Sequence, residues 1–221
     1  MSGPDEGRRG VRRRAMAWMY DRMMRSYERF MAERKAALLS DLEGQVVEIG
    51  VGTGANLRYL NRERVEWIGV EPSLPMRRRA EAERQRRGVR GCVAHGTAED
   101  TGLDDACADV VVSTLVLCSV EDVPGALREA QRILRPGGRM VFIEHVAAPP
   151  GTWLRRVQNG AAPFWRWFAD GCRCNALTLP HLEAAGFASL EMESFRAPAG
   201  LCSPHVQGVA VVPGANLGAA G

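Results

Sequence analysis

The chain has 221 residues, of which 46% are hydrophobic and 25% are charged, and its net charge is +3. This length suits one large domain with an ample core, and the composition is that of an ordinary globular protein. Apolar runs stay well below the ~20 residues that span a bilayer, and charges recur through residues 16–35, which argues against a signal peptide. We therefore expect a soluble, cytoplasmic protein without a membrane span.

The cysteines and arginines indicate which kinds of metal site and binding partner to expect. Six cysteines are scattered without the rhythm of a disulfide scaffold, and Cys172 and Cys174 have no second pair with zinc-ligand spacing. We expect free thiols and no metal. Arginines crowd residues 8–14 and 77–90, but no aromatic residues interleave with the second cluster. We interpret the clusters as a tail and a solvated helix face, and expect a monomer or weak homodimer without a nucleic-acid partner.

The chain begins with a segment that we expect to be a disordered basic tail over residues 1–14. A single domain is expected over 15–212 and a flexible tail over 213–221. From residue 16 to 31, apolar side chains recur at intervals of three and four, which predicts one helix face. That face consists of Met16, Met19, Tyr20, Met23, Met24, Tyr27, Phe30 and Met31. A helical cap over 15–40 can pack on the core, cover a ligand cavity, or do both.

Strands and helices then alternate along the chain. Strands are predicted over 45–50, 65–71, 91–95, 109–114 and 138–146, with helices over 54–62, 75–88 and 122–134. An aromatic insertion over 147–176, which we expect to be a loop, precedes a helix over 177–185 and strands near 188–195 and 205–212. This alternation predicts an α/β, Rossmann-like fold, a mostly parallel seven-stranded sheet with helices on both faces. Ligands of such sheets bind beyond the carboxyl ends of the strands.

The segment from Val46 to Asn56 predicts a ligand-binding turn between the first strand and a helix. Three alternate glycines, Gly50, Gly52 and Gly54, let the backbone approach a ligand closely. Glu48 stands just before them, and its carboxylate suits a ligand that carries a positive amine, such as S-adenosylmethionine, better than the phosphates of a dinucleotide. The dinucleotide fingerprint also has a different glycine spacing, G-x-G-x-x-G.

The second predicted strand ends in another acid, Glu71, which stands 21 positions after Gly50. An acid at that distance can hold both hydroxyls of an adenosine ribose. This observation does not separate NAD from S-adenosylmethionine, because both ligands contain that ribose. Further segments at the carboxyl ends of predicted strands are Gly96–Asp100, Leu115–Cys118 and Glu144–Val146.

Together these motifs resemble the class I S-adenosylmethionine-dependent methyltransferases over about residues 40–146. The resemblance rests on Glu48–Asn56, Glu71, Gly96–Asp100, Asp109–Val112 and Leu134–Gly138. A closer resemblance, over about 45–212, is to the thiol S-methyltransferases known from mammals. It rests on Thr114–Val120, Glu144–Ala148, Trp153, Phe168–Cys172 and Pro204–Val206. The chain lacks the apolar membrane-anchoring helix of the mammalian members. Its arginine- and glycine-rich composition fits a bacterial member acting on its own thiol metabolites.

The resemblance implies transfer of a methyl group from S-adenosylmethionine to a small-molecule thiol or reduced dithiol, leaving S-adenosylhomocysteine. It implies that the glycine loop lines the cofactor, Glu71 binds the ribose, residues 97–99 meet the adenine, and Leu115 offers its backbone to the methionine part. The full expected cofactor set is Tyr20, Glu48, Gly50, Gly52, Gly54, Asn56, Glu71, Pro72, Thr97, Ala98, Glu99, Leu115 and Val116.

The acceptor side is predicted from residues expected over the active end of the sheet. Substrate contacts are expected from the cap, the aromatic insertion and one cysteine, namely Met23, Tyr27, Trp165, Phe168 and Cys172. A thiolate is the nucleophile and a free thiol has a pKa of about 8.5, so one modest base suffices. The candidates are His145 and Asp170. His145 can instead make a structural hydrogen bond, and Asp170 can instead end a helix or turn.

Three other functions stay open at this point. The same fold can methylate oxygen, nitrogen or carbon on a quinone-like or other small metabolite. A reductase that binds NAD(P) is disfavoured by Glu48 and by the glycine spacing. A methyltransferase that acts on nucleic acid is disfavoured because Ser113–Val116 replaces the Asn/Asp-Pro-Pro-aromatic motif after the fourth strand.

Overall fold

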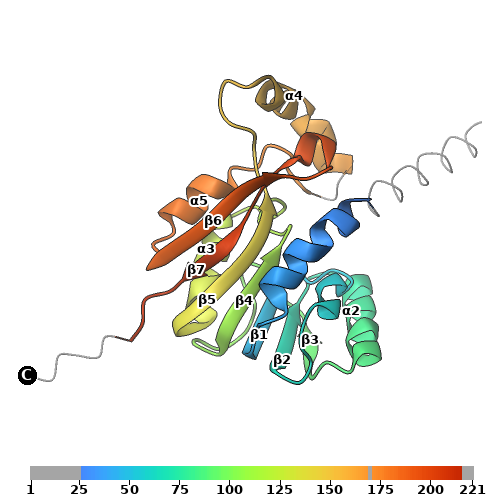
Figure 1. The fold of residues 1–221 in the computed structure, drawn as a ribbon, viewed down its shortest axis with the longest axis vertical. Coiled ribbons are helices and arrows are strands. Elements are labelled where there is room, and N and C mark those ends of the chain that lie inside the picture. The colour runs from blue at the N-terminus through green and yellow to red at the C-terminus, as the bar shows by residue number, and fades with distance from the viewer. Residues whose placement is uncertain (1–25, 169–170, 216–221) are drawn as a thin grey trace, which may run out of the picture.

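The structure is a computed structural model that describes residues 26–168 and 171–215, and its centre is one twisted sheet (Figure 1). The strand order is β3-β2-β1-β4-β5-β7-β6. Strands β1 to β5 run parallel, and β7 lies antiparallel between β5 and β6. The predicted mostly parallel, seven-stranded sheet is confirmed. The strands are β1 Gly44–Ile49, β2 Val65–Val70, β3 Gly91–Ala94, β4 Ala108–Thr114, β5 Leu134–His145, β6 Ser189–Arg196 and β7 Pro204–Val211.

Helices cover both faces of the sheet, as predicted. The helices of the described residues are the helix over 26–39, α2 Leu74–Arg87, α3 Val123–Ile133, α4 Trp153–Phe168 and α5 Thr178–Ala184, with 3-10 helices at Ala55–Arg58 and Gly200–Cys202. One core joins α3 and α5 to the face that carries Val47 and Val111. A second core joins the helix over 26–39 and α2 to the face that carries Val46 and Val110. Neighbouring strand residues therefore serve opposite cores, because side chains alternate across a strand.

The helix predicted over 54–62 is wrong in type and length. The segment forms a 3-10 helix at Ala55–Arg58, in which Leu57 N–H donates to Gly54 C=O and Tyr59 N–H donates to Asn56 C=O. A tight turn follows directly before β2, in which Arg64 N–H donates to the carbonyl of Asn61. The chain between β1 and β2 thus leaves room for one helical turn, and the turn keeps the glycine loop close to the sheet.

The aromatic insertion was predicted as a loop, and this prediction is also wrong, because most of it forms α4 (Figure 1). Its less exposed positions include Leu154, Gln158, Ala161 and Trp165, a spacing of three and four that marks one helix face. Phe164, Trp167 and the first residue, Trp153, stay exposed. Among the residues that the structure describes, no helix is long and apolar enough to cross a membrane.

Candidate active site

The glycine loop after β1 is the first part of the site. Gly50, Gly52 and Gly54 all have positive φ angles, of 59°, 56° and 81°. A Cβ atom at Gly50 would lie 2.6 Å from the Val116 side chain, and one at Gly54 would lie 2.8 Å from Leu57, whereas one at Gly52 would meet nothing within 4 Å. The loop is therefore packed against the protein at both ends and faces open space at Gly52. Such a loop fits a ligand that must approach the backbone closely.

Glu48 is buried beneath this loop and is held by two donors. Its Oε1 accepts a hydrogen bond from Asn56 Nδ2 at 2.9 Å, and its Oε2 accepts one from Trp67 Nε1 at 3.0 Å. The amide of Asn56 also donates to Thr114 Oγ1. Among the described residues, the buried Asn56 Oδ1 has no hydrogen-bond partner. Burial raises the pKa of Glu48 to about 7, so its charge changes near neutral pH.

Glu71 ties the end of β2 to the glycine loop. Its Oε2 accepts a hydrogen bond from the Gly52 N–H at 3.0 Å, and its Oε1 accepts one from the Ser73 N–H at 2.9 Å. Arg77 donates to the carbonyls of Glu71 and Pro72, which holds this turn from the other side. A carboxylate has about four acceptor positions, so capacity remains for two hydroxyl groups. Glu71, the residue predicted to bind the ribose, thus lies next to the open side of Gly52.

The segment after β3 forms a tight turn at the same edge of the sheet. Thr97 N–H donates to the carbonyl of Asp100 at 2.8 Å, and Thr97 Oγ1 accepts from the Asp100 N–H at 3.1 Å. Ala98 is buried in the core, while Glu99 is half-buried. The turn presents its backbone and the exposed side chain of Thr97, which is compatible with its predicted place near a planar base.

The segment after β4 carries backbone strain. Leu115 has a φ of 59°, which a residue with a side chain rarely adopts. Its N–H donates to the Ile143 carbonyl at 2.8 Å, and the Val116 N–H donates to Glu144 Oε1 at 3.1 Å. Glu144 is fully buried, also accepts from Ser113 Oγ, and has its pKa raised by burial. Sequence reasoning missed this positioning role for Glu144, although an acid at the end of a buried strand signals one.

Three side chains that are distant in sequence meet beyond the ends of β4 and β5. His145 Nε2 lies 2.9 Å from Cys172 Sγ. The sulfur atoms of Cys118 and Cys172 and a ring nitrogen of His145 all lie within 4.8 Å of one another. Hydrogen bonds from Cys118 and Cys202, together with the imidazole of His145, lower the pKa of Cys172. Hydrogen bonding to Cys172 and burial raise the pKa of Cys118. The group thus favours a thiolate at Cys172 beside the ring of His145.

Tyr27, on the helix over 26–39, reaches the same region. Its hydroxyl lies 3.0 Å from Nε2 of His205, and burial raises the pKa of Tyr27. The ring of His205 lies 6.1 Å from the ring of His145, and burial lowers the pKa of His205 to about 4. His205 is therefore a neutral, buried link between the helical cap and the end of β5. Sequence reasoning missed this link.

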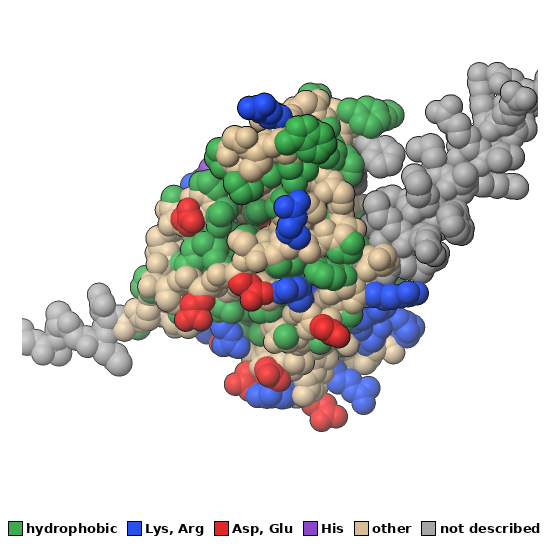
Figure 2. Space-filling model, turned by 45° about the horizontal axis from the view of Figure 1, so that its top comes forward, with side chains coloured by type: hydrophobic (Ala, Val, Ile, Leu, Met, Phe, Trp, Pro, Cys, Tyr) green, Lys and Arg blue, Asp and Glu red, His purple; other side chains and the backbone are tan. Residues whose placement is uncertain are grey.

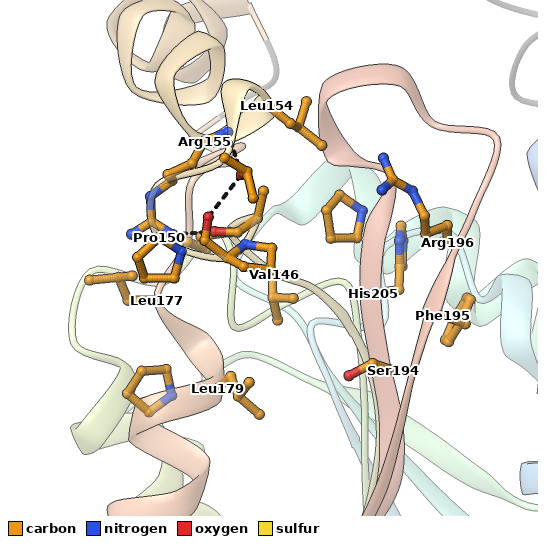
Figure 3. A pocket seen from close by; sticks show the side chains of 17 residues that line it. Val146, Pro150, Leu154, Arg155, Leu177, Leu179, Ser194, Phe195, Arg196 and His205 are labelled. Carbon is orange, nitrogen blue, oxygen red and sulfur yellow. Dashed lines mark hydrogen bonds between the residues drawn. The ribbon is translucent and has the colours of Figure 1, made fainter.

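A cavity of about 560 Å³ is lined in part by His205 (Figure 3). Figure 3 shows Leu154 and Arg155 from α4 on one side, and Ser194, Phe195 and Arg196 from β6 on the other. Further apolar walls come from Val146, Pro149, Pro150, Ala176, Leu177 and Leu179. The cavity is mainly apolar, and hydrophobic side chains also gather on the surface around α4 (Figure 2). The helical spacing of α4 was the signal that could have identified its contribution.

The predicted substrate residues are placed as follows. Cys172 belongs to the cluster with His145. Tyr27 contacts His205, whose ring lies beside the ring of His145. Trp165 is half-buried on α4, and Phe168 ends that helix. Among the described side chains, those of Tyr27, Trp165 and Cys172 do not line the cavity. The predicted residues Tyr20, Met23 and Asp170 lie outside the described residues.

Comparison with known proteins identifies relatives over most of the chain. The family model described as a methyltransferase domain matches residues 47–142. The human thiol S-methyltransferase TMT1A is 36% identical over 198 residues, which are 84% of this chain and 81% of the relative. The human thiol S-methyltransferase TMT1B is 37% identical over 199 residues, covering 83% and 80%. A crystal structure of an S-adenosylmethionine-dependent methyltransferase from Thermotoga maritima has a TM-score of 0.59 at 26% identity, covering 89% of this chain and 95% of that chain.

Proposed function

The chain belongs to the class I S-adenosylmethionine-dependent methyltransferases, and we propose that it methylates the sulfur of a small thiol. The names of the two human relatives support this acceptor. The observation that carries the proposal is the mainly apolar cavity, which is lined in part by His205, whose ring lies 6.1 Å from the ring of His145. S-Adenosylmethionine supplies a methyl group that its sulfonium already activates. The protein has to hold both reactants, exclude water and accept one proton.

The cofactor would be held by the edge of the sheet where β1 to β4 end. We assign the open side of Gly52 to close backbone contact and the spare acceptor positions of Glu71 to the two ribose hydroxyls. Glu48 would favour the positive amine while it is ionised. The strained Leu115 would present backbone groups, because its conformation is held by the hydrogen bond from the neighbouring Val116 N–H to Glu144. The remaining contacts are assigned to Asn56, Pro72, Thr97, Ala98, Glu99 and Val116.

The acceptor would enter through the apolar cavity. Its walls from α4, α5 and β6 can bury an apolar thiol and keep water from the reacting sulfur. The buried, neutral His205 would form the inner wall of this path. An apolar, water-poor environment suits the soft sulfur nucleophile, whereas an alcohol would need a much stronger base to ionise.

His145 would accept the thiol proton at Nδ1. Nε2 faces Cys172, and the buried Nδ1 has no hydrogen-bond partner among the residues described. A thiolate at Cys172 that accepts a hydrogen bond from Nε2–H fixes the tautomer with a free lone pair on Nδ1. The same negative charge stabilises the imidazolium formed when the proton arrives. Cys172 is therefore a positioning residue in this proposal, and Asp170 is the alternative base.

Paired acceptors test the proposal directly. The full chain, S-adenosylmethionine and either thiophenol or phenol are incubated at neutral pH, and methylated products are measured by mass spectrometry. A second pair, cyclohexanethiol and cyclohexanol, removes the aromatic ring from the comparison. We expect both thiols to be methylated much faster than their oxygen analogues, because a thiolate is accessible near neutral pH. Faster methylation of phenol would assign the enzyme to oxygen acceptors.

A further inference from the structure

Cys172 interacts with two other free thiols, Cys118 and Cys202, and the three thiols differ in exposure. Cys118 follows β4 and Cys202 lies in the 3-10 helix before β7, and both are buried. Cys172 follows α4 and is only half-buried. The fold thus places one accessible thiol against two inaccessible ones. This arrangement has no role in methyl transfer beyond the positioning of His145.

A backbone hydrogen bond holds the segments that carry Cys118 and Cys172 side by side. The N–H of Arg173, the residue after Cys172, donates to the carbonyl of Cys118 at 3.0 Å. A further hydrogen bond joins the Arg173 side chain to the carbonyl of Val120. Because the two sulfur atoms also lie within 4.8 Å of each other, small side-chain rotations can bring them to the ~2.05 Å of a disulfide bond.

Cys172 also has the environment of a reactive thiol. His145 Nε2 lies 2.9 Å from its sulfur, and hydrogen bonds from Cys118 and Cys202 lower its pKa. The thiolate is the nucleophilic form of cysteine. Oxidation-sensitive cysteines are accessible, have a low pKa and stand next to a second thiol that can resolve the oxidised form. All of these features coincide at this position.

We propose that Cys172 is a site of reversible oxidation by hydrogen peroxide, and that Cys118 resolves it as an intramolecular disulfide. The Cys172 thiolate attacks one peroxide oxygen, the O–O bond breaks, and hydroxide leaves and is protonated to water, which yields a sulfenic acid. The Cys118 sulfur then attacks the Cys172 sulfur, the S–O bond breaks, and water leaves with the thiol proton. A dithiol reverses the reaction by thiol–disulfide exchange.

The bridge would remove the thiolate that orients His145. Oxidised protein should therefore lose methyl-transfer activity and regain it on reduction. This consequence rests on the proposed function, whereas the oxidation of Cys172 does not. The two can be separated because the disulfide is detected by mass, without any acceptor or cofactor.

The test oxidises the full chain with hydrogen peroxide, blocks remaining thiols with N-ethylmaleimide and maps the peptides by mass spectrometry. We expect a peptide pair joined through Cys118 and Cys172 that disappears after dithiothreitol. Cys172→Ser should abolish the bridge, and Cys118→Ser should leave a sulfenic acid that dimedone traps. Cys107→Ser is the matched control, because this thiol is half-buried but outside the cluster, and it should leave the bridge intact.

Three outcomes would overturn the proposal. A bridge between Cys172 and Cys202 would refute Cys118 as the resolving thiol. Full alkylation of all six cysteines after peroxide would refute the oxidation itself. Stoichiometric zinc in the purified protein, measured by elemental analysis, would show that Cys118, His145 and Cys172 hold a metal instead. Reduced protein that methylates no thiol would refute the proposed function and leave the peptide map as an independent result.

Discussion

Replacing Glu71 by alanine should weaken cofactor binding without unfolding the protein. The carboxylate accepts one backbone N–H on each oxygen, from Gly52 and Ser73, and retains acceptor capacity for the two ribose hydroxyls. Hydrogen bonds to a charged group contribute about 1.5–3 kcal/mol, so the dissociation constant should rise about 10- to 150-fold. Gly52 and Ser73, which carry the two released N–H groups, are only half-buried, so water can replace the carboxylate. We therefore expect a loss of stability of only about 1 kcal/mol.

Isothermal titration calorimetry with S-adenosylhomocysteine measures this effect, at one pH and salt concentration. Glu71→Gln should fall between wild type and alanine, because it keeps one acceptor oxygen but turns an amide donor towards another donor. Glu66→Ala is the matched control, since Glu66 is an exposed acid on the same strand, and it should leave the affinity unchanged. If Glu71→Ala binds the cofactor within twofold of wild type, the ribose assignment is wrong.

Four further predictions concern the loop, its buried acid and the base. Affinity for S-adenosylmethionine should rise from pH 6 to pH 8, because Glu48, with a pKa of about 7, gains its charge in this range. Calorimetry on Glu48→Gln should show an affinity that does not change with pH. An equal pH dependence in wild type and variant would exclude Glu48 as the cause. Gly50→Ala should lower the free energy of unfolding by about 2 kcal/mol or more, because of its positive φ and a contact at 2.6 Å, measured by urea denaturation. Gly52→Ala should cost only about 1–2 kcal/mol in the same assay but weaken cofactor binding, since its Cβ projects into open space; the reverse ranking would contradict the loop assignment. His145→Ala should lower kcat on thiols about 10- to 100-fold at pH 7, with a smaller loss at pH 9 where the substrate ionises unaided; His181→Ala is the control, and an equal loss at every pH would mean a structural role.

The linear sequence was enough to place the residues predicted to bind the cofactor at one edge of the sheet. Glu48, the three glycines and Glu71 are local signals, because each stands where an apolar strand ends and a turn begins. In a parallel sheet these strand ends meet at one edge, so their proximity follows from the strand assignment alone. The same reasoning placed His145 on the acceptor side. Its failures within this region were local as well, since the length of the turn after Gly54 depends on how soon β2 must begin.

The acceptor side depended on contacts that no local pattern encodes. Cys172 meets His145 across 27 positions, and Tyr27 meets His205 across 178. These pairs form because β7 inserts beside β5 and because the chain after α4 returns to the loop after β4. Which side chains face one another there is set by packing and strand register, which are properties of the whole fold. The sequence thus determined which acids and glycines gather at the edge proposed for the cofactor, whereas tertiary structure alone decided which histidine and cysteines meet on the proposed acceptor side.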